Sequence, residues 1–429
     1  MPYPPISTQS QTRVSALPYT TQRPHDEPPI PARARREFGA VFLSLLLASC
    51  GGDAGSGNGQ DSAGQGSDSQ FSPEGPAGTW LRQDPQAEPG EPEYRPYSGI
   101  TAGNGYVYYW GGGHKTHGGN DVDAYDIAAN EWGQLTEEEN WENAQSWLED
   151  EGWYPDRSQS ERQQLVNRLE GSRGGGWEVD IRTPRGRPVT KHSYAQMAWW
   201  PGHGYCLLKQ RFWCYDPQEG DADGAWTDLG PDPFEFGNSG TIAPWNLAYD
   251  RELDTVVTVV GTRETGKVYV YDTESGSWRT ALNNIQYQQG EYSEVYSAHD
   301  PETDWHIVFA NQKWQRINAA TGEIKSMAQL RYNGQVVKGS FSIEWAPELG
   351  KALVAKRMDG QLRMWAYDPQ ANQWSDFQLE GTGPDDAHAQ WDTLARDPRT
   401  GMYVFLAKAD ESAEEGETPT TWTFWLRSE

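Results

Sequence analysis

The sequence predicts an all-β fold, a single six-bladed β-propeller, and three observations support this prediction. A Tyr-Asp pair followed by Trp recurs along the chain at intervals of about 50 residues, a repeat length found in propeller blades. A turn-like segment and a short apolar run precede each copy, as a four-stranded blade requires. The chain also has 21 Trp and 21 Tyr among its 429 residues, and aromatic side chains favour strands over helices.

The Tyr-Asp and Trp landmarks mark the last two strands of each blade. They occur as Tyr125-Asp126 with Trp132, Tyr215-Asp216 with Trp226, Tyr271-Asp272 with Trp278 and Tyr367-Asp368 with Trp374, and Ile317-Asn318 with Ile324 is a divergent copy. The apolar runs fall at 106–110, 205–208, 255–260, 306–310, 352–355 and 402–407. Six blades follow, beginning near Tyr97, Thr190, Gly240, Tyr292, Gly339 and His388.

The sixth blade has only three strands of its own. Residues 421–427 supply the third strand, and no Trp-bearing strand follows it. Thr79-Trp80-Leu81, which precedes the first blade, has the composition of the missing strand. Pairing these two segments closes the ring and removes an open sheet edge. The sequence therefore predicts that an N-terminal strand closes the last blade.

The repeat resembles that of the Kelch-type propellers, the group that includes the central domain of galactose oxidase. The landmark spacing and the cluster Gly111-Gly112-Gly113 in blade 1 carry the resemblance, which extends over residues 77–429. Later blades have Gly261, Ala310, Ala355 and Ala407 in place of that cluster. Copper chemistry of the galactose oxidase type needs a tyrosine cross-linked to a cysteine, and the two cysteines of the fold lie in one hairpin. We therefore expect the fold of this group without its copper and with no other cofactor.

Residues 1–50 are predicted to be a secretory leader. Arginines at positions 33, 35 and 36 precede a largely apolar run over 38–49, the order found in signal sequences. This run is too short for an ordinary membrane-spanning helix. Leu47-Ala48-Ser49-Cys50 resembles the lipobox of bacterial lipoproteins, which implies cleavage before Cys50 and lipidation of that residue. A buried helix and a signal cleaved without lipidation are the alternatives.

Residues 51–76 are predicted to be a flexible linker. They are rich in Gly, Ser and Asp, and a segment of this composition cannot bury a core. A lipid anchor, a tether and a folded domain follow one another in a consistent order. We therefore expect a lipid-anchored protein of the bacterial cell envelope, which contacts the membrane through its anchor only.

A helical insertion is predicted at residues 137–184, between blades 1 and 2. Helical spacing of apolar residues occurs over 141–148 and 158–169, outside the β-repeat. An insertion of this length is a lid over one mouth of the channel or a decorated loop, and the sequence leaves both open.

Charge and cysteine spacing exclude several classes of function. The formal net charge of −27 argues against nucleic acid, since phosphate binding needs a basic surface, and we expect a monomer. No cysteine pair has CxxC spacing, so the sequence predicts no metal site. Cys206 and Cys214 flank a short turn, and an odd-numbered turn would place them opposite each other at disulfide distance. Whether they are bonded or reduced stays open.

The ligand is expected at the channel mouth that is formed by the loops entering the first strands and those joining second to third strands. Polar and aromatic groups that converge on such a concave surface suit a carbohydrate or a protein segment. The candidate ligand-binding residues are His114, His117, Asn120, Arg187, His192, Tyr194, Tyr292 and Trp391.

A polysaccharide lyase is the alternative to a binding protein. Some propeller lyases use His and Tyr as base and acid, with Arg or His neutralising a uronate carboxylate. His114, His192, Tyr194 and Arg187 are the candidates for these roles, and we expect His114 and His192 on the same mouth. No nucleophile elbow, phosphate loop or HExxH motif occurs in the sequence. Binding and catalysis therefore both stay open, and no catalytic residue is assigned.

Overall fold

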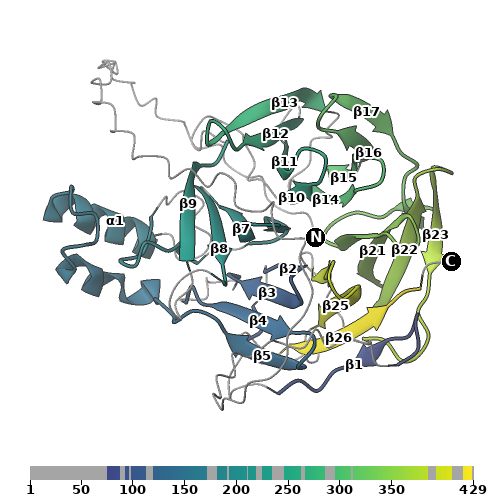
Figure 1. The fold of residues 1–429 in the computed structure, drawn as a ribbon, viewed down its shortest axis with the longest axis horizontal. Coiled ribbons are helices and arrows are strands. Elements are labelled where there is room, and N and C mark those ends of the chain that lie inside the picture. The colour runs from purple at the N-terminus through teal and green to yellow at the C-terminus, as the bar shows by residue number, and fades with distance from the viewer. Residues whose placement is uncertain are drawn as a thin grey trace, which may run out of the picture. The chain divides into compact units, whose positions relative to one another are not determined.

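Six four-stranded antiparallel sheets stand in a ring around a central axis (Figure 1). The predicted all-β, six-bladed propeller is therefore confirmed. The computed structural model describes residues 75–86, 92–95, 98–112, 119–171, 181–190, 193–209, 211–218, 225–233, 246–261, 266–285, 295–310, 313–384, 393–407 and 419–427. All of them belong to the second of the two compact units of the chain, which spans Asp68–Glu429.

Blades 1 to 3 each follow the chain from the innermost to the outermost strand. Blade 1 contains β2 (Ile100–Gly103), β3 (Tyr106–Trp110), β4 (Val122–Asp126) and β5 (Glu131–Gln134). Blade 2 contains β6 (Met197–Trp200), β7 (Gly204–Lys209), β8 (Arg211–Asp216) and β9 (Ala225–Pro231). Blade 3 contains β10 (Ala248–Asp250), β11 (Thr255–Gly261), β12 (Gly266–Asp272) and β13 (Ser277–Ile285).

Blades 4 and 5 repeat this order, and blade 6 takes its outermost strand from the N-terminal side. Blade 4 contains β14 (Val295–Asp300), β15 (Trp305–Ala310), β16 (Lys313–Asn318) and β17 (Glu323–Ser326). Blade 5 contains β20 (Ser342–Ala346), β21 (Lys351–Met358), β22 (Gln361–Asp368) and β23 (Gln373–Phe377). Blade 6 contains β24 (Leu394–Arg396), β25 (Met402–Ala407), β26 (Thr420–Trp425) and β1 (Leu81–Arg82), and a small hairpin of β18 (Arg331–Tyr332) and β19 (Gln335–Val336) lies between blades 4 and 5 in the sequence.

The repeated landmarks are cross-strand pairs between the third and fourth strands. Tyr125 lies directly opposite Trp132, and the same pairing joins the other landmarks in blades 2, 3 and 5. Aromatic pairs of this kind stabilise neighbouring strands. The Asp126 carboxylate accepts hydrogen bonds from the backbone N–H groups of Ala128 and Ala129, at 2.9 and 3.0 Å. The aspartate of the landmark therefore stabilises the turn between the third and fourth strands.

The N-terminal strand closes blade 6 as predicted. Leu81 pairs with Thr423, and Arg82 pairs with Trp422. The Trp80 side chain is 8% exposed and contacts Phe424 edge-on, with ring centroids 4.8 Å apart. The open edge of β26 is thereby covered by a segment more than 330 residues away in the sequence, which fixes the ring in its closed form.

Adjacent blades pack face to face through apolar side chains. Between blades 1 and 2, the Trp199 indole stacks on Tyr108, with ring centroids 5.5 Å apart and planes 9° apart. A Cβ atom at Gly103 would lie 2.1 Å from that indole, so only glycine fits at this position. Large aromatic residues therefore fill the wedge between blades while small residues on the facing strand make room for them.

The insertion after blade 1 folds as a small unit with its own core. It contains a 3-10 helix, η1 (Trp141–Glu149), and an α-helix, α1 (Gln159–Gly171). Ser158 and Glu161 form a capping box, in which the Ser158 N–H donates to the Glu161 carboxylate at 2.8 Å. Trp153, Leu165 and Val166 are buried in this core. Among the described residues, no helix has the length and hydropathy needed to cross a membrane.

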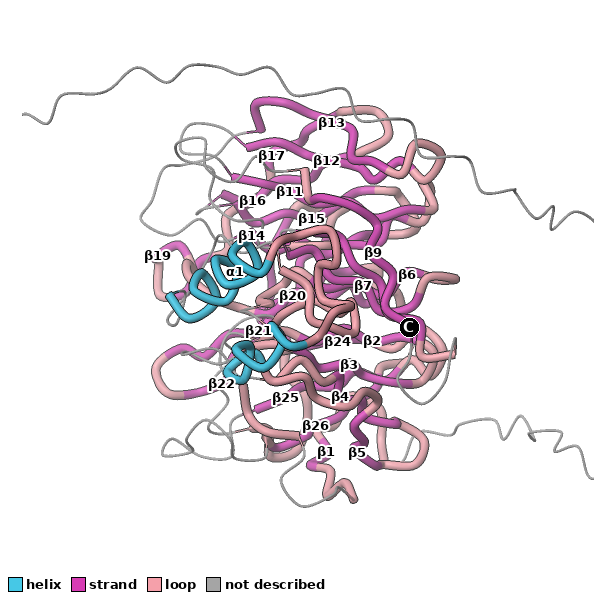
Figure 2. Tube along the Cα trace, turned by 90° about the vertical axis from the view of Figure 1, so that its left-hand side faces the viewer, coloured by secondary structure: helices cyan, strands magenta, loops and turns pink. Residues whose placement is uncertain are grey.

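The described part of the insertion lies beside the ring. Figure 1 shows α1 projecting outward from the edge of the ring near β4 and β9, away from the centre. Figure 2, seen from that side, shows both helices in front of the blades. Residues 172–180 of the insertion lie outside the described residues, and the lid and the decorated loop both stay predictions.

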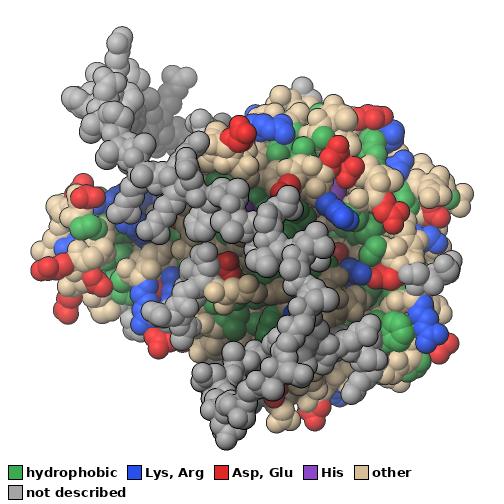
Figure 3. All heavy atoms as spheres, in the orientation of Figure 1, with side chains coloured by type: hydrophobic (Ala, Val, Ile, Leu, Met, Phe, Trp, Pro, Cys, Tyr) green, Lys and Arg blue, Asp and Glu red, His purple; other side chains and the backbone are tan. Residues whose placement is uncertain are grey.

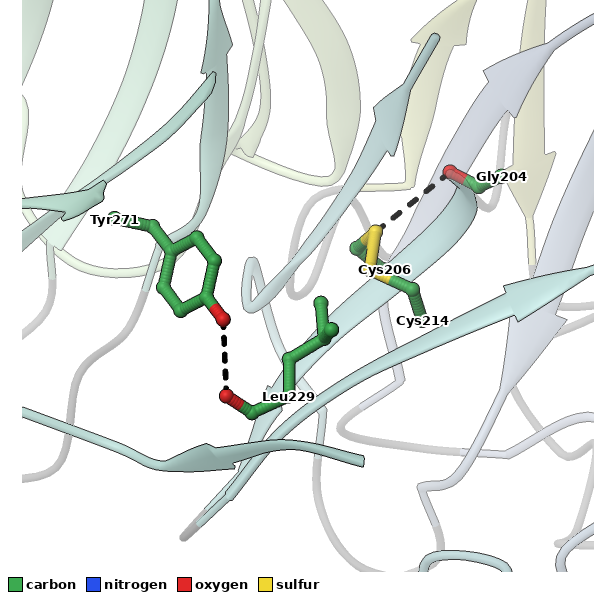
Figure 4. The surroundings of a disulfide bond; sticks show 5 residues. All are labelled: Gly204, Cys206, Cys214, Leu229 and Tyr271. Atoms are coloured by element: carbon green, nitrogen blue, oxygen red, sulfur yellow. Dashed lines mark hydrogen bonds between the residues drawn. A yellow bond between two sulfur atoms is a disulfide. The ribbon is translucent and has the colours of Figure 1, made fainter. Parts of the chain in front are cut away.

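Cys206 and Cys214 form a disulfide in blade 2 (Figure 4). The two residues lie directly opposite each other on β7 and β8, as an odd-numbered turn requires. The bond is buried, and the Cys206 sulfur lies 3.8 Å from the carbonyl oxygen of Gly204. Nearby, the Tyr271 hydroxyl of blade 3 donates a hydrogen bond of 3.0 Å to the Leu229 carbonyl of blade 2.

Candidate functional site

The inner strands of the six blades contact one another and surround a central channel with two different ends. At the end that we call the turn end, short turns join the first strand of each blade to the second. At the loop end, the chain enters each first strand. A cavity of about 520 Å³ lies at the turn end. Its lining includes the first turn residues Pro201, Arg251, Pro301, Pro347 and Pro398.

One position of the repeat supplies most of the aromatic and titratable side chains that line this cavity. The position lies on the inner strand and pairs with the second residue of the next strand, as Tyr249 pairs with Val256 and His299 with His306. Its occupants in blades 2 to 6 are Trp199, Tyr249, His299, Trp345 and Arg396. All five line the cavity. The propeller therefore uses equivalent backbone sites to place aromatic, basic and imidazole groups around one space.

The aromatic residues of the cavity are held in fixed orientations. Trp199 and Tyr249 are half-buried, so that part of each ring stays accessible. The Tyr249 hydroxyl donates a hydrogen bond of 2.8 Å to Asp254, and burial raises the pKa of Tyr249 to about 12. These two rings offer apolar faces beside polar edges, which is the arrangement that binds the faces of sugar rings or peptide groups.

A charged cluster lies between blades 5 and 6. The Nε atom of Arg396 donates a hydrogen bond of 3.0 Å to Glu348, and the Tyr403 hydroxyl donates one of 2.7 Å to the same carboxylate. The Glu344 carboxylate accepts backbone hydrogen bonds from Trp345 at 2.9 Å and Arg396 at 3.3 Å. Burial raises the pKa of Glu344 to about 7, although Arg396 partly opposes this shift.

Glu344 is expected to make the stability of the protein depend on pH near neutrality. Because its folded pKa of about 7 lies above the ordinary value of 4.5, the folded state keeps a proton that the unfolded state has lost in this interval. Its contribution to the free energy of unfolding is present below about pH 4.5 and is lost as the pH rises through about 7. Glu344→Gln should therefore be more stable than the parent by about 1–3 kcal/mol at pH 8, and the gain should nearly vanish at pH 5.

Urea unfolding at the two pH values measures this effect. Glu323→Gln, an exposed carboxylate on the outer strand β17, is the matched control and should change little at either pH. An equal change for Glu344→Gln at both pH values would show that Glu344 does not titrate in this range.

A second polar cluster lies between blades 3 and 4. His299 and His306 face each other across β14 and β15, with ring centroids 4.7 Å apart. The Nε2 atom of His306 lies 2.9 Å from Oδ2 of Asp250, and Nε2 of His299 lies 3.9 Å from Oδ1. Burial lowers the pKa of His299 to about 3, so its ring is neutral. The side chains of His299, His306 and Asp250 are 7%, 1% and 2% exposed.

Three of the eight candidate ligand-binding residues predicted from the sequence lie in the described part of the chain, and all three are buried. The Asn120 side chain donates to the Pro188 carbonyl at 3.2 Å and accepts from the Glu139 N–H at 2.8 Å, which ties blade 1 to the insertion. Arg187 donates to the Glu137 carbonyl at 2.5 Å. Tyr194 has a positive φ of 46° and packs against blades 3 and 4. Their observed contacts are thus with the protein itself. His114, His117, His192, Tyr292 and Trp391 lie outside the described residues.

The residues that flank two of the predicted histidine segments contact each other. The Thr190 hydroxyl donates a hydrogen bond to the Gly119 carbonyl, and the Ser193 hydroxyl donates one of 2.9 Å to the Trp110 carbonyl. The described residues that flank the two segments therefore lie next to each other between blades 1 and 2. The prediction that His114 and His192 share one mouth remains a prediction.

The cavity residues were missed by the sequence analysis, which considered only the loop end. The pattern that could have revealed them is the turn itself. In blade 4 the turn Pro301-Glu302-Thr303-Asp304 separates two strands, and counting outward from it places His299 opposite His306. The same count in the other blades identifies the ring of inner-strand residues.

Comparisons with known proteins assign the chain to no family. No protein-family model matches the chain, and no curated protein matches it. Among solved structures, a luciferin-regenerating enzyme is similar, with a TM-score of 0.44 and 10% sequence identity over 78% of this chain and 95% of that one. This similarity assigns no site residue to the chain.

Proposed function

We propose that the protein is a lipid-anchored, Kelch-type propeller of the bacterial cell envelope that binds a small saccharide in the cavity at the turn end. The cavity carries this proposal. Its volume of about 520 Å³ lies in the range of small-ligand sites, about 300–1,000 Å³. All six inner strands contribute to it, so the fold holds its shape. A folded protein partner would need a larger and more open surface.

The lining suits a ligand with both apolar faces and hydroxyl groups. Trp199 and Tyr249 are half-buried and line the cavity, so their rings offer apolar surface to a ligand. Arg251, which is exposed at the rim, and the Ser297 hydroxyl offer polar groups beside them. A few polar groups set among aromatic side chains give a binding site orientation and specificity.

Arg251→Ala should weaken saccharide binding without loss of stability. A hydrogen bond from a charged donor contributes about 1.5–3 kcal/mol, and the lower figure corresponds to roughly tenfold in affinity. The full chain is screened against mono- and disaccharides by thermal shift, and the affinity of each ligand found is measured by calorimetry. Arg279→Ala, an exposed arginine on the outer strand β13 of the same blade, is the matched control. Equal affinities of the two variants would place the ligand elsewhere.

The polysaccharide lyase remains the alternative function. No described contact favours it, because Arg187 and Tyr194 are 3% and 4% exposed and pack within the protein. Release of unsaturated uronate products from an acidic polysaccharide would support the lyase over the binding protein. The formal net charge of −27 also favours a protein that does not bind nucleic acid. Among the described residues, Figure 3 shows acidic and basic side chains interspersed around the edge of one face, with no basic side chains gathered there into one patch.

The proposed anchor is tested at Cys50. The order of basic residues, apolar run, Leu47-Ala48-Ser49-Cys50 and linker supports lipidation of this residue. Cys50→Ala should move the protein from the membrane fraction to the soluble fraction, because the lipid is attached through the cysteine sulfur, which alanine lacks. Fractionation with immunoblotting measures the change, and Cys206→Ala serves as the control that keeps the anchor. Retention of Cys50→Ala on the membrane would contradict the proposal.

A further inference from the structure

The interface between blades 3 and 4 places three metal-ligating side chains around one point. Asp250 ends β10, and His299 and His306 face it from β14 and β15. The possible ligand atoms of the three side chains all lie within 4.8 Å of one another. Two imidazoles and one carboxylate form a ligand set that is common for divalent transition metals, of which zinc is the usual example.

We propose that Asp250, His299 and His306 bind a single divalent transition-metal ion of the zinc type. Donors about 2.0–2.1 Å from a tetrahedral zinc ion are about 3.3 Å apart. The observed separations of 2.9 Å and 3.9 Å between the histidine nitrogens and the Asp250 oxygens lie on either side of this value. Small side-chain rotations would therefore give metal geometry. This site does not depend on saccharide binding in the cavity.

The surroundings of the His299 Nε2 atom support a metal ion at this point. Its Nε2 atom is buried and has no hydrogen-bond partner among the described residues, yet it points toward the Asp250 carboxylate. A buried polar atom without a partner costs about 1–3 kcal/mol, so such atoms are uncommon in folded proteins. A metal ion would satisfy this nitrogen and would also neutralise the buried Asp250 carboxylate.

Comparison among the blades shows that the fold does not need these histidines. Asp300 and Asp397 occupy the position of Asp250 in blades 4 and 6, and their carboxylates accept hydrogen bonds from backbone N–H groups of their own turns. In blades 2, 3, 5 and 6, the residues at the position equivalent to His306 are Tyr205, Val256, Ala352 and Tyr403. The aspartate thus has a role in the turns, while the paired histidines are specific to this one interface.

The proposed site has an open coordination position. Three protein ligands leave one position of a tetrahedral ion for water or another oxygen ligand. Of the three ligands, His299 lines the cavity at the turn end, so the proposed site borders that cavity.

Zinc binding to the full chain tests the proposal. The protein is freed of metal with a chelator and titrated with zinc chloride against a chromophoric chelator, with cobalt(II) chloride as a spectroscopic probe of tetrahedral nitrogen and oxygen ligation. We expect one ion per chain and a rise in Tm that grows with zinc concentration. His299→Gln should weaken binding at least about 100-fold and abolish the rise in Tm, since it removes a direct ligand.

Two control variants separate this site from three other histidines of the chain. His203→Gln changes an exposed histidine that packs against Trp200 in a turn of blade 2, and the double variant H114Q/H117Q changes the two histidines of segment 113–118. Both should keep the zinc affinity of the parent. Absence of zinc binding by the parent would overturn the proposal, as would unchanged affinity in His299→Gln or loss of binding in the double variant only.

Discussion

Trp80→Ala is expected to lower the free energy of unfolding by about 3–5 kcal/mol, the usual cost of removing a buried large aromatic side chain. Trp80 packs against Phe405, Trp422 and Phe424 of blade 6 from the strand that closes the ring. The loss combines the transfer free energy of the indole with that of the cavity it leaves. Unfolding in urea, followed by tryptophan fluorescence, measures the change in midpoint.

Arg82→Ala is the matched control for this prediction. Arg82 lies on the same strand, but its side chain is exposed, so its removal should change stability by less than about 0.5 kcal/mol. Deletion of residues 1–83 removes the whole strand, exposes an unpaired edge of β26 and should cost more than either substitution. A truncated protein that unfolds at the midpoint of the parent would show that β1 does not hold the ring closed.

Arg95→Met is expected to cost about 3–5 kcal/mol, because it leaves buried carboxylates without their guanidinium. The Nη2 atom of Arg95 lies 2.5 Å from Asp121 and 2.7 Å from Asp123, and all three side chains are at most 4% exposed. Although burial opposes its charge, the two carboxylates raise the pKa of Arg95 above its ordinary value, so they favour the charged guanidinium. Thermal unfolding of the variant measures the loss.

A compensated variant separates the effect of charge from that of packing. Addition of Asp121→Asn and Asp123→Asn to Arg95→Met removes the uncompensated charges and should restore part of the stability. A triple variant as unstable as Arg95→Met alone would show that packing of the arginine side chain, rather than its charge, holds blade 1 together.

The sequence was sufficient to predict the ring because its signal is local. Tyr125 and Trp132 are seven positions apart and meet across a single turn, so their spacing records a strand pair directly. The closing strand could be predicted by the same reasoning, since blade 6 has no Trp-bearing fourth strand of its own and another segment must supply it. These features depend on pairing within one sheet, which an alternating pattern along the chain reveals.

The cavity was harder to predict because it is formed by neighbouring blades. Tyr249 and His299 lie on the inner strands of different blades, and both line the cavity only because one sheet packs against the next. Asn120 shows the opposite difficulty, since a polar residue in a glycine-rich loop suggests a ligand but here anchors the insertion to blade 1. Residue type alone could not distinguish a polar group that binds a ligand from one that binds the backbone.

Hydrogen–deuterium exchange of the full chain, with and without the tightest-binding saccharide from the screen, tests the location of the site most directly. Binding at the turn end predicts slower exchange in peptides that cover the ends of the inner strands and their turns, at 199–203, 249–254 and 396–401. Peptides that cover 113–118 and 191–192 at the loop end should exchange at the same rate in both samples. Protection confined to those two loop-end segments, with the turn-end peptides unchanged, would contradict the assignment of the cavity as the binding site.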